Sequence, residues 1–201
     1  MFASVDFSIA NIKSFGLNPI VAINKYSNDD VNEIDFLKNE VSKVSEIELL
    51  NNWENGSDGA IDFCNKLLKI VDKDNKISFA YNINDDLKTK VYDIATKIYG
   101  ARDVLYTDKA IEELSIINKI TNNTKGLEVC IAKTQYSFSD DKSNLICSKD
   151  FDITITGVEL KNGAGFVVVK AGDIMTMPGL PRVPAAESID VDDDGNIVGV
   201  F

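Results

Sequence analysis

The feature that most constrains the fold is a short apolar run at residues 20–23, which lies between Pro19 and a polar stretch that begins at Asn24. A continuous, largely β-branched run of this length is typical of a strand buried on both faces of a parallel sheet. In open sheets of this kind, ligands bind just beyond the carboxyl ends of the strands. We therefore expect residues 24–30 to be the first place where this chain carries chemistry.

Helix and strand patterns alternate through the first seventy residues. Apolar residues recur every three or four positions in three stretches, and a second apolar run at 47–50 predicts another strand. The predicted helices cover residues 5–15, 31–44 and 60–71. This α-β-α-β-α order predicts a doubly wound parallel sheet unit. The unit is incomplete, because two parallel strands do not form a stable sheet by themselves.

Two of these helices carry further local signals. Asn28, Asp29 and Asp30 offer N-cap oxygens to the helix at 31–44. The acidic groups of Asp29, Asp30 and Glu33 suit its positive end. The helix at 60–71 is expected to turn one apolar face inward. That face consists of Ile61, Cys64, Leu67 and Leu68.

The charged residues 72–76 form the best candidate boundary, which divides the chain into domains 1–74 and 75–201. The second part is predicted to contain helices at 85–99 and 108–120, strands at 77–81, 104–106 and 127–133, and a strand, turn and strand between 151 and 169. Three of the four prolines fall between 172 and 184 and exclude a regular element there. The fold class is therefore α/β: an incomplete doubly wound unit, then a smaller α/β domain with a C-terminal hairpin around Asp194 and Gly195.

Charge and composition exclude several classes of function. A net charge of −11 argues against a surface for nucleic acid or for anionic lipid. The absence of histidine removes Ser-His-Asp and Cys-His catalysis and His-ligated zinc. The three widely spaced cysteines, Cys64, Cys130 and Cys147, are expected to be buried small hydrophobes in a reducing compartment. With no long apolar stretch and no signal-peptide layout, we predict a cytoplasmic protein.

Two motifs match known sites only in part. Asn24-Lys25 after an apolar strand resembles the guanine-reading element of P-loop GTPases, but Ser27 stands where an Asp is required and no phosphate loop precedes the strand. The spacing of Asp190, Asp192 and Asp194 matches half of an EF-hand loop. Phe201 stands where the closing Glu would be. A hairpin turn is favoured over a calcium site.

Acidic pairs in loops offer weaker candidates. Asp29-Asp30 and Asp140-Asp141 have the chemistry for acid–base work or for binding magnesium. Adjacent acids in loops more often cap helices and solubilise the surface, and we favour that interpretation for both pairs.

Two aromatic residues are better candidates for a binding site. Trp53, the only tryptophan, lies in a Gly- and Asn-rich loop at 51–59, and Tyr26 lies in the loop after the preceding predicted strand. If the two strands are parallel neighbours, both loops emerge at one edge and the rings are placed to sandwich a planar heterocycle. Gly56 and Gly59 would let the backbone approach such a ligand closely. The alternative is that Trp53 folds back and packs into the core.

Several segments give the chain a close resemblance to formate–tetrahydrofolate ligase (10-formyltetrahydrofolate synthetase), from Asn11 to Phe201. The most specific is Met-Thr-Met-Pro-Gly-Leu-Pro within the run at 172–187. The others are Asn-Ile-Lys-Ser-Phe-Gly at 11–16, Val-Ala-Ile-Asn at 21–24, Ala-Lys-Thr-Gln-Tyr-Ser-Phe-Ser-Asp at 132–140 and Gly-Ala-Gly-Phe at 163–166. The match corresponds to the C-terminal third of a typical family member.

The resemblance implies an enzyme that makes formyl phosphate from ATP and formate and transfers the formyl group to N10 of tetrahydrofolate. Magnesium accompanies ATP, and a monovalent cation assists. The phosphate loop and the Lys and Arg groups that hold ATP lie upstream in the family. We therefore expect no cofactor to bind this chain alone, and we expect the chain alone to be inactive.

The resemblance also implies a role for particular residues. The family stacks the pterin between a Phe, followed by Pro, in one loop and a Trp in the next. Those positions correspond to Tyr26, followed by Ser27, and to Trp53. Tyr26 adds a hydroxyl that needs a partner, Ser27 loosens a loop that Pro would fix, and Asn24 is expected to support the loop.

The role of Lys133, Thr134 and Gln135, which match a strongly patterned family segment, stays open between positioning of the C-terminal domain and ligand contact. The expected partners are tetrahydrofolate, including polyglutamylated forms, and the upstream domain or other subunits, since the family is commonly homotetrameric. The alternative function is a non-catalytic folate-binding or subunit-interaction fragment.

Overall fold

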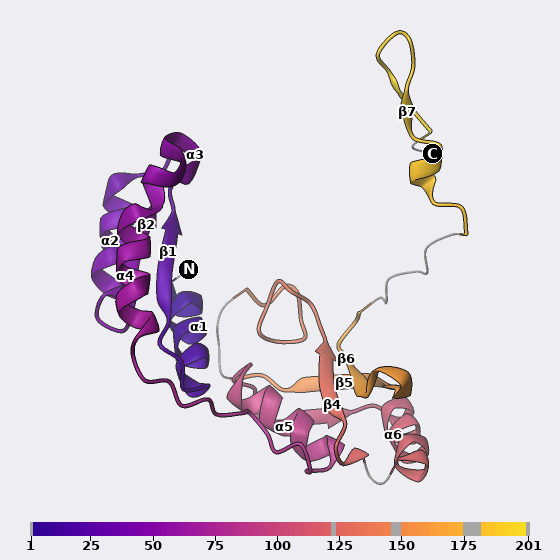
Figure 1. The fold of residues 1–201 in the computed structure, drawn as a ribbon. Helices are drawn as coiled ribbons and strands as arrows, with labels where there is room; N and C mark the ends of the chain where they lie inside the picture. Colours follow the sequence, from indigo (N-terminus) through magenta and orange to yellow (C-terminus); the bar gives the residue numbers. More distant parts are fainter. Residues whose placement is uncertain (1, 122–123, 146–149, 175–181, 200–201) are drawn as a thin grey trace.

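A computed structural model of the 201-residue chain describes residues 2–121, 124–145, 150–174 and 182–199 (Figure 1). The described residues form two α/β units with separate sheets, followed by a small hairpin. This arrangement confirms the mixed α/β class with parallel strands and a C-terminal antiparallel hairpin.

The first unit is built around two parallel strands. β1 (Ile20–Asn24) pairs with β2 (Glu46–Leu50) in a register that runs from Ile20 opposite Glu46 to Asn24 opposite Leu50. In Figure 1, α1 and α2 lie on opposite sides of these strands. The helices of the unit are α1 (Phe2–Ser14), α2 (Val31–Val41), the short α3 (Asn52–Asn55) and α4 (Ile61–Val71).

Burial in this unit differs from the sequence-based expectation. β1 is not buried on both faces: Val21 and Ile23 are half-buried against a small core that includes Ile9, whereas Ala22 and Asn24 are exposed. The reason is the size of the sheet, since in the described residues two strands leave part of each face uncovered. The α2 cap is confirmed, because the Asp30 carboxylate accepts a hydrogen bond from the Asn32 N–H.

The predicted inward face of α4 is wrong. Ile61, Leu67, Leu68 and Cys64 are exposed, and Ile70 is the buried residue of this helix. The helix is therefore rotated relative to the expectation, and Lys66 reaches the sheet, where its ammonium donates to the Ile47 carbonyl at 2.8 Å. The predicted loop at 51–59 is also more regular than expected, because it contains α3 and a 3-10 helix (Gly56–Ala60).

Glu48 on β2 gives the first unit a charged interaction that depends on pH. Its carboxylate lies 3.0 Å from the Lys66 ammonium and 3.7 Å from that of Lys38. The Leu49 N–H donates to the same carboxylate at 2.9 Å, and this bond together with the two lysines lowers the pKa of Glu48 below its usual value of 4.5. A carboxyl group with a lowered folded-state pKa stabilises the fold above its unfolded pKa.

We therefore expect Glu48 to contribute stability at neutral pH that is lost as the pH falls below about 4.5 and through the lower folded-state pKa. Urea unfolding of the wild type and of Glu48→Gln, measured from about pH 7 to about pH 3, tests this. The stability difference between the two proteins should shrink toward acid. A difference that stays constant over this range would contradict the assignment.

The second unit has a four-stranded mixed sheet in the order β3-β5-β6-β4. β5 and β6 are antiparallel, whereas β3 pairs with β5 and β4 with β6 in parallel. Buried Ile, Val and Ala side chains of β5 and β6 pack against the apolar faces of α5 and α6. The elements are α5 (Leu87–Lys97), β3 (Val104–Tyr106), α6 (Asp108–Ile120), β4 (Glu128–Ala132), β5 (Ile153–Lys161) and β6 (Phe166–Ala171).

Two expectations for the middle of the chain are wrong. Residues 77–81 do not form a strand; instead the Ser78 N–H donates to the Phe15 carbonyl of the first unit, and Phe79 is exposed. Cys130, like Cys64, is exposed, so these two cysteines are not core residues. Cys147 lies outside the described residues.

The C-terminal hairpin is confirmed, with β7 (Asp190–Val191) antiparallel to β8 (Ile197–Val198). The Asp192 carboxylate accepts hydrogen bonds from the N–H groups of Asp194 and Asn196 and so closes the turn. In the part of the chain that the structure describes, no group of three acidic or sulfur side chains could hold a metal ion. Most of the proline- and methionine-rich segment, residues 175–181, lies outside that part.

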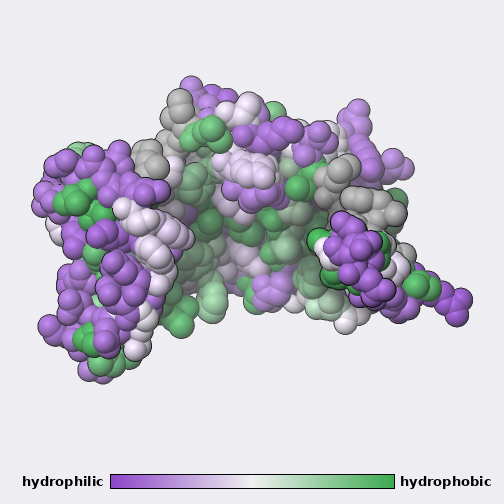
Figure 2. All heavy atoms as spheres, turned by 90° about the horizontal axis from the view of Figure 1, so that it is seen from above, coloured by the Kyte–Doolittle hydropathy of each residue, from purple (hydrophilic) through white to green (hydrophobic). Residues whose placement is uncertain are grey.

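Helix α1 connects the two units. The Asn11 side chain donates a hydrogen bond to the Ile98 carbonyl at 2.7 Å, just after α5 ends. The rings of Phe7 and Phe138 meet edge to face, with their centroids 4.5 Å apart. Viewed from above in Figure 2, the surface is hollowed beside the first unit, and hydrophobic residues line the hollow. Among the described residues, none of the helices has the length and apolar character needed to cross a bilayer.

Candidate functional site

The carboxyl ends of β1 and β2 lie side by side at one edge of the first unit, at the top of Figure 1 beside α3. Asn24 and Leu50 are partners in the sheet, and the Lys25 N–H extends the pairing with a 2.9 Å bond to the Leu50 carbonyl. Tyr26 follows β1 by two residues, and Trp53 follows β2 by three. The structure therefore brings both predicted aromatic loops to the same edge.

The Tyr26 loop is held by its own polar groups. The Asp29 carboxylate accepts a hydrogen bond from the Tyr26 N–H at 2.7 Å, and the Asp29 N–H donates to the Tyr26 carbonyl at 3.2 Å. The Asn24 amide donates to the Tyr26 hydroxyl at 3.0 Å, so this hydroxyl has the partner it requires. Ser27 is exposed in the turn. These bonds fix the loop without a proline.

Asp29 was missed as a site residue because an acid at the start of a helix is expected to act as a cap. In the structure Asp30 caps α2, and Asp29 instead holds the backbone of Tyr26. The spacing of three between Tyr26 and Asp29 is the signal that was available, since Asp side chains often bond to backbone groups this close.

Trp53 links the two loops. Its indole N–H donates to the Lys25 carbonyl at 3.0 Å, so this side chain of α3 is bonded to the loop after β1. Trp53 and Tyr26 are each 58% exposed, which excludes the alternative in which Trp53 packs into the core. Within the described residues, the one pair of aromatic rings in contact is Phe7 with Phe138, so Tyr26 and Trp53 do not stack on each other.

The two glycines after Trp53 have different surroundings. Gly59 lies against Asn51: a Cβ at this position would be 2.3 Å from the Asn51 carbonyl oxygen, and the Asn51 N–H donates to the Gly59 carbonyl at 3.2 Å. Its close approach is therefore to its own chain rather than to a ligand. Gly56 has a φ of +56°, and nothing lies within 4 Å of where its Cβ would be. The Asn51 side-chain oxygen is buried without a hydrogen-bond partner in this loop.

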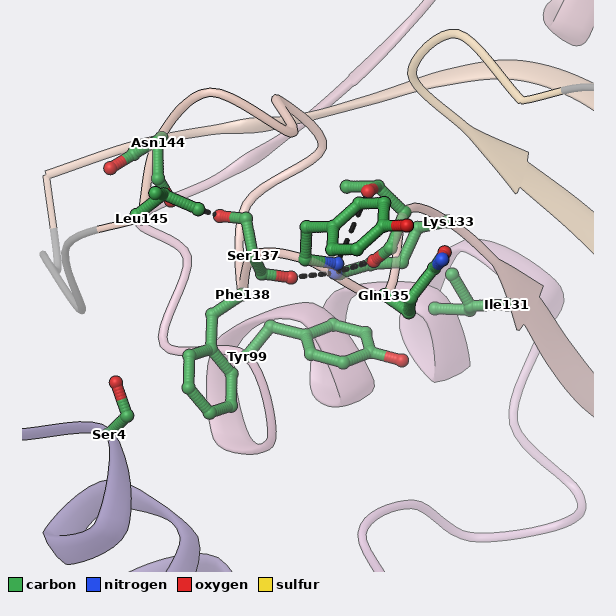
Figure 3. A pocket seen from close by; sticks show the side chains of 11 residues that line it. Ser4, Tyr99, Ile131, Lys133, Gln135, Ser137, Phe138, Asn144 and Leu145 are labelled. Carbon is green, nitrogen blue, oxygen red and sulfur yellow. Dashed lines mark hydrogen bonds between the residues drawn. The ribbon is translucent and has the colours of Figure 1, made fainter. Parts of the chain in front are cut away.

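A second candidate site is a cavity of about 510 Å³ beyond the carboxyl end of β4 (Figure 3). It is lined by residues of α1, of the 131–138 segment and of the 144–145 segment, with Tyr99 in its wall. Lys133, Thr134 and Gln135 all line it, so the patterned segment at 132–140 forms part of the wall of this cavity. The segment is not part of the Tyr26 and Trp53 edge.

The ammonium group of Lys133 makes its contacts with other groups of the protein. Its ammonium donates to the carbonyls of Thr134 and Ser137 and lies 4.9 Å from the centroid of the Tyr99 ring. Partial burial lowers the pKa of Lys133. These contacts close the turn that carries Phe138 to its contact with Phe7 on α1. They favour the positioning role over ligand contact for Lys133.

Comparison with known proteins identifies the family. A sequence profile described as formate–tetrahydrofolate ligase matches residues 2–201. The chain belongs to the formate–tetrahydrofolate ligase family. Because the match covers the described edge and both units, the resemblance seen in the individual segments extends along the whole chain.

Relatives show how much of a ligase the chain represents. The formate–tetrahydrofolate ligase of Campylobacter concisus (strain 13826) is 42% identical over 194 residues, and that of Staphylococcus aureus (strain NCTC 8325 / PS 47) is 41% identical over the same length. Each match covers 96% of this chain and 35% of the relative. The chain therefore spans about a third of the length of these ligases.

The two acidic pairs that the sequence offered as candidates for acid–base work or for magnesium form hydrogen bonds within the protein. In the loop after β1, the carboxylates of Asp29 and Asp30 each accept a hydrogen bond from a backbone N–H. The pair Asp140-Asp141 is likewise used locally, since Asp140 accepts from the Thr154 N–H and Asp141 from the Ser143 N–H. These bonds favour a structural role for both pairs.

Proposed function

We propose that this chain supplies the tetrahydrofolate-binding wall of a formate–tetrahydrofolate ligase, with the pterin held between the rings of Tyr26 and Trp53. Asn24 orients the Tyr26 ring through its hydroxyl, and Asp29 and the turn at Ser27 hold the loop. The first unit is then part of a doubly wound sheet whose ligand edge is the carboxyl end of β1 and β2.

One observation carries the proposal: the hydrogen bond from the Trp53 indole to the Lys25 carbonyl. It joins the two loops at the edge where α/β sheets bind ligands, and it leaves both aromatic rings 58% exposed. Large aromatic surfaces exposed at a single edge suit a flat heterocycle, because offset stacking is favourable on either ring.

The remaining chemistry is assigned to the part of a ligase outside this chain. ATP with Mg²⁺, the monovalent cation and formyl phosphate would bind there, and the cytoplasmic homotetramer belongs to the complete enzyme. The alternative, a non-catalytic folate-binding or subunit-interaction fragment, has the same aromatic edge. The two functions are distinguished by adding the part of a ligase that lies outside this chain. Only the ligase function requires that tetrahydrofolate is then formylated.

Binding of tetrahydrofolate is expected to quench the fluorescence of Trp53, which is the only tryptophan in the chain. Tyr26→Ala should weaken binding by roughly tenfold, because one stacking face is lost. Tyr26→Phe keeps the ring and should stay within about threefold of the wild type, since it removes only an exposed hydrogen bond.

The titration is corrected for absorption by tetrahydrofolate with a free tryptophan derivative at the same optical density. Equal binding by the wild type and Tyr26→Ala would show that Tyr26 is not part of the pterin site. The titration is repeated after addition of the part of a ligase that lies outside this chain. If saturable quenching is seen neither without nor with that part, the proposed function itself is overturned.

A further inference from the structure

Helix α4 carries a stripe of apolar side chains that nothing in the described structure covers. Ile61, Leu68 and Val71 are 52%, 65% and 63% exposed, and Cys64 between them is also exposed. Their spacing of three, four and three residues places them along one face of the helix. We call these four residues the α4 stripe.

The α4 stripe differs from the scattered apolar residues of an ordinary surface. Single exposed leucines need no explanation, but a contiguous apolar patch marks an interaction site. Ile70 of the same helix is buried, so α4 has a wide apolar arc of which this fold buries one side. The sheet beneath it has two strands among the described residues, whereas parallel sheets are normally covered on both faces.

The occupant follows from the length of the relatives and from charge. About two thirds of each ligase lies outside the region that this chain matches. A second copy of the chain is disfavoured, because each carries a net charge of −11 and self-repulsion opposes association. We propose that the α4 stripe docks the part of a formate–tetrahydrofolate ligase that lies outside this match. The inference rests on the proposed function in assuming that this chain works together with that part.

The test uses the 201-residue chain and, as the probe, the separately expressed part of the Campylobacter concisus ligase outside the matched region. Binding is followed by sedimentation velocity and by calorimetric titration. Leu68→Glu and Val71→Glu are expected to weaken binding at least tenfold, because each places a charge within the apolar contact. Ile116→Glu is the matched control: this residue is an exposed apolar side chain on α6, and its substitution should leave binding unchanged.

Circular dichroism is used to check that each variant is folded. We expect all three to fold, because each substituted residue is exposed. Loss of binding in both stripe variants but not in Ile116→Glu supports the proposal. Wild-type affinity in the stripe variants, or no binding of the probe to the wild type, overturns it. Self-association of the chain that Leu68→Glu abolishes also overturns it, in favour of a second copy as the occupant. Quenching of Trp53 by tetrahydrofolate is measured on the same samples, so failure of the docking is distinguished from failure of the proposed function.

Discussion

Replacing Lys90 by alanine is expected to lower the free energy of unfolding by about 4 kcal/mol. Lys90 lies on α5 in the second unit and is completely buried. Its ammonium donates to the Thr124 carbonyl at 3.0 Å and to the Leu127 carbonyl at 2.9 Å, and it lies 5.9 Å from the centroid of the Tyr81 ring. Burial lowers the pKa of this lysine, while the charges of Glu128, Asp85 and Asp86 act in the opposite direction.

The size of the effect has two sources. Loss of the buried aliphatic stem costs about 2 kcal/mol, at roughly 0.8 kcal/mol for each methylene group. Loss of the ammonium removes a donor from two carbonyls, one of which belongs to Thr124, a buried residue in the left-handed region at a φ of 60°. That loss costs about another 2 kcal/mol.

Three variants separate these contributions in a urea unfolding experiment. Lys90→Met keeps most of the stem and should lose about 2 kcal/mol, and Lys90→Ala about 4 kcal/mol. Lys119→Ala, at an exposed position on α6, should change stability by less than about 0.5 kcal/mol. If Lys90→Met were as stable as the wild type, the hydrogen bonds would not stabilise the fold and the cost of burying the charge would cancel them.

Lys90 also shows why periodicity gives helices but not all of their contacts. The predicted helices at 108–120 and 85–99 are confirmed as α6, which begins after the Thr107 cap, and α5, which begins after the Asp86 cap. A lysine on the same helix is expected to face solvent. It is buried here because a loop distant in sequence presents carbonyl groups to it, and no local pattern records where that loop lies.

The errors in the first unit have a different physical cause. Patterns predict which face of α4 is apolar but not how much sheet is present to cover it, so Cys64 and Leu68 were expected to be buried and are exposed. The predicted strand at 77–81 is wrong for a related reason. The Ser78 N–H donates to the Phe15 carbonyl and not to a neighbouring strand. An apolar run forms a strand only where a neighbouring strand is available to pair with it.

The candidate site was predictable where it follows from topology. Parallel strands end at one edge, so the order of elements was sufficient to bring Tyr26 and Trp53 together. The bonds that hold them were not predictable, since the indole of Trp53 donates to a backbone carbonyl and Asp29 bonds to the backbone of Tyr26. Backbone acceptors are present at every residue, and only the folded chain selects among them.

Gly59→Ala is expected to disrupt this site at least as much as Tyr26→Ala does. The added methyl group would lie 2.3 Å from the oxygen and 2.5 Å from the carbon of the Asn51 carbonyl. Both are backbone atoms, so the clash is relieved only if the loop itself moves. Movement lengthens the bond from the Asn51 N–H to the Gly59 carbonyl, which closes the turn that carries Trp53.

The expected results are a red-shifted emission of Trp53, because its indole leaves the Lys25 carbonyl for water, and a loss of tetrahydrofolate quenching of at least tenfold. Overpacking should also lower the free energy of unfolding by about 2 kcal/mol. Gly163→Ala is the matched control, since nothing lies within 4 Å of its added methyl group. Emission and quenching identical to the wild type in Gly59→Ala would mean that the Asn51–Gly59 contact does not position Trp53, which would leave the bond from its indole to the Lys25 carbonyl as the contact that holds the ring.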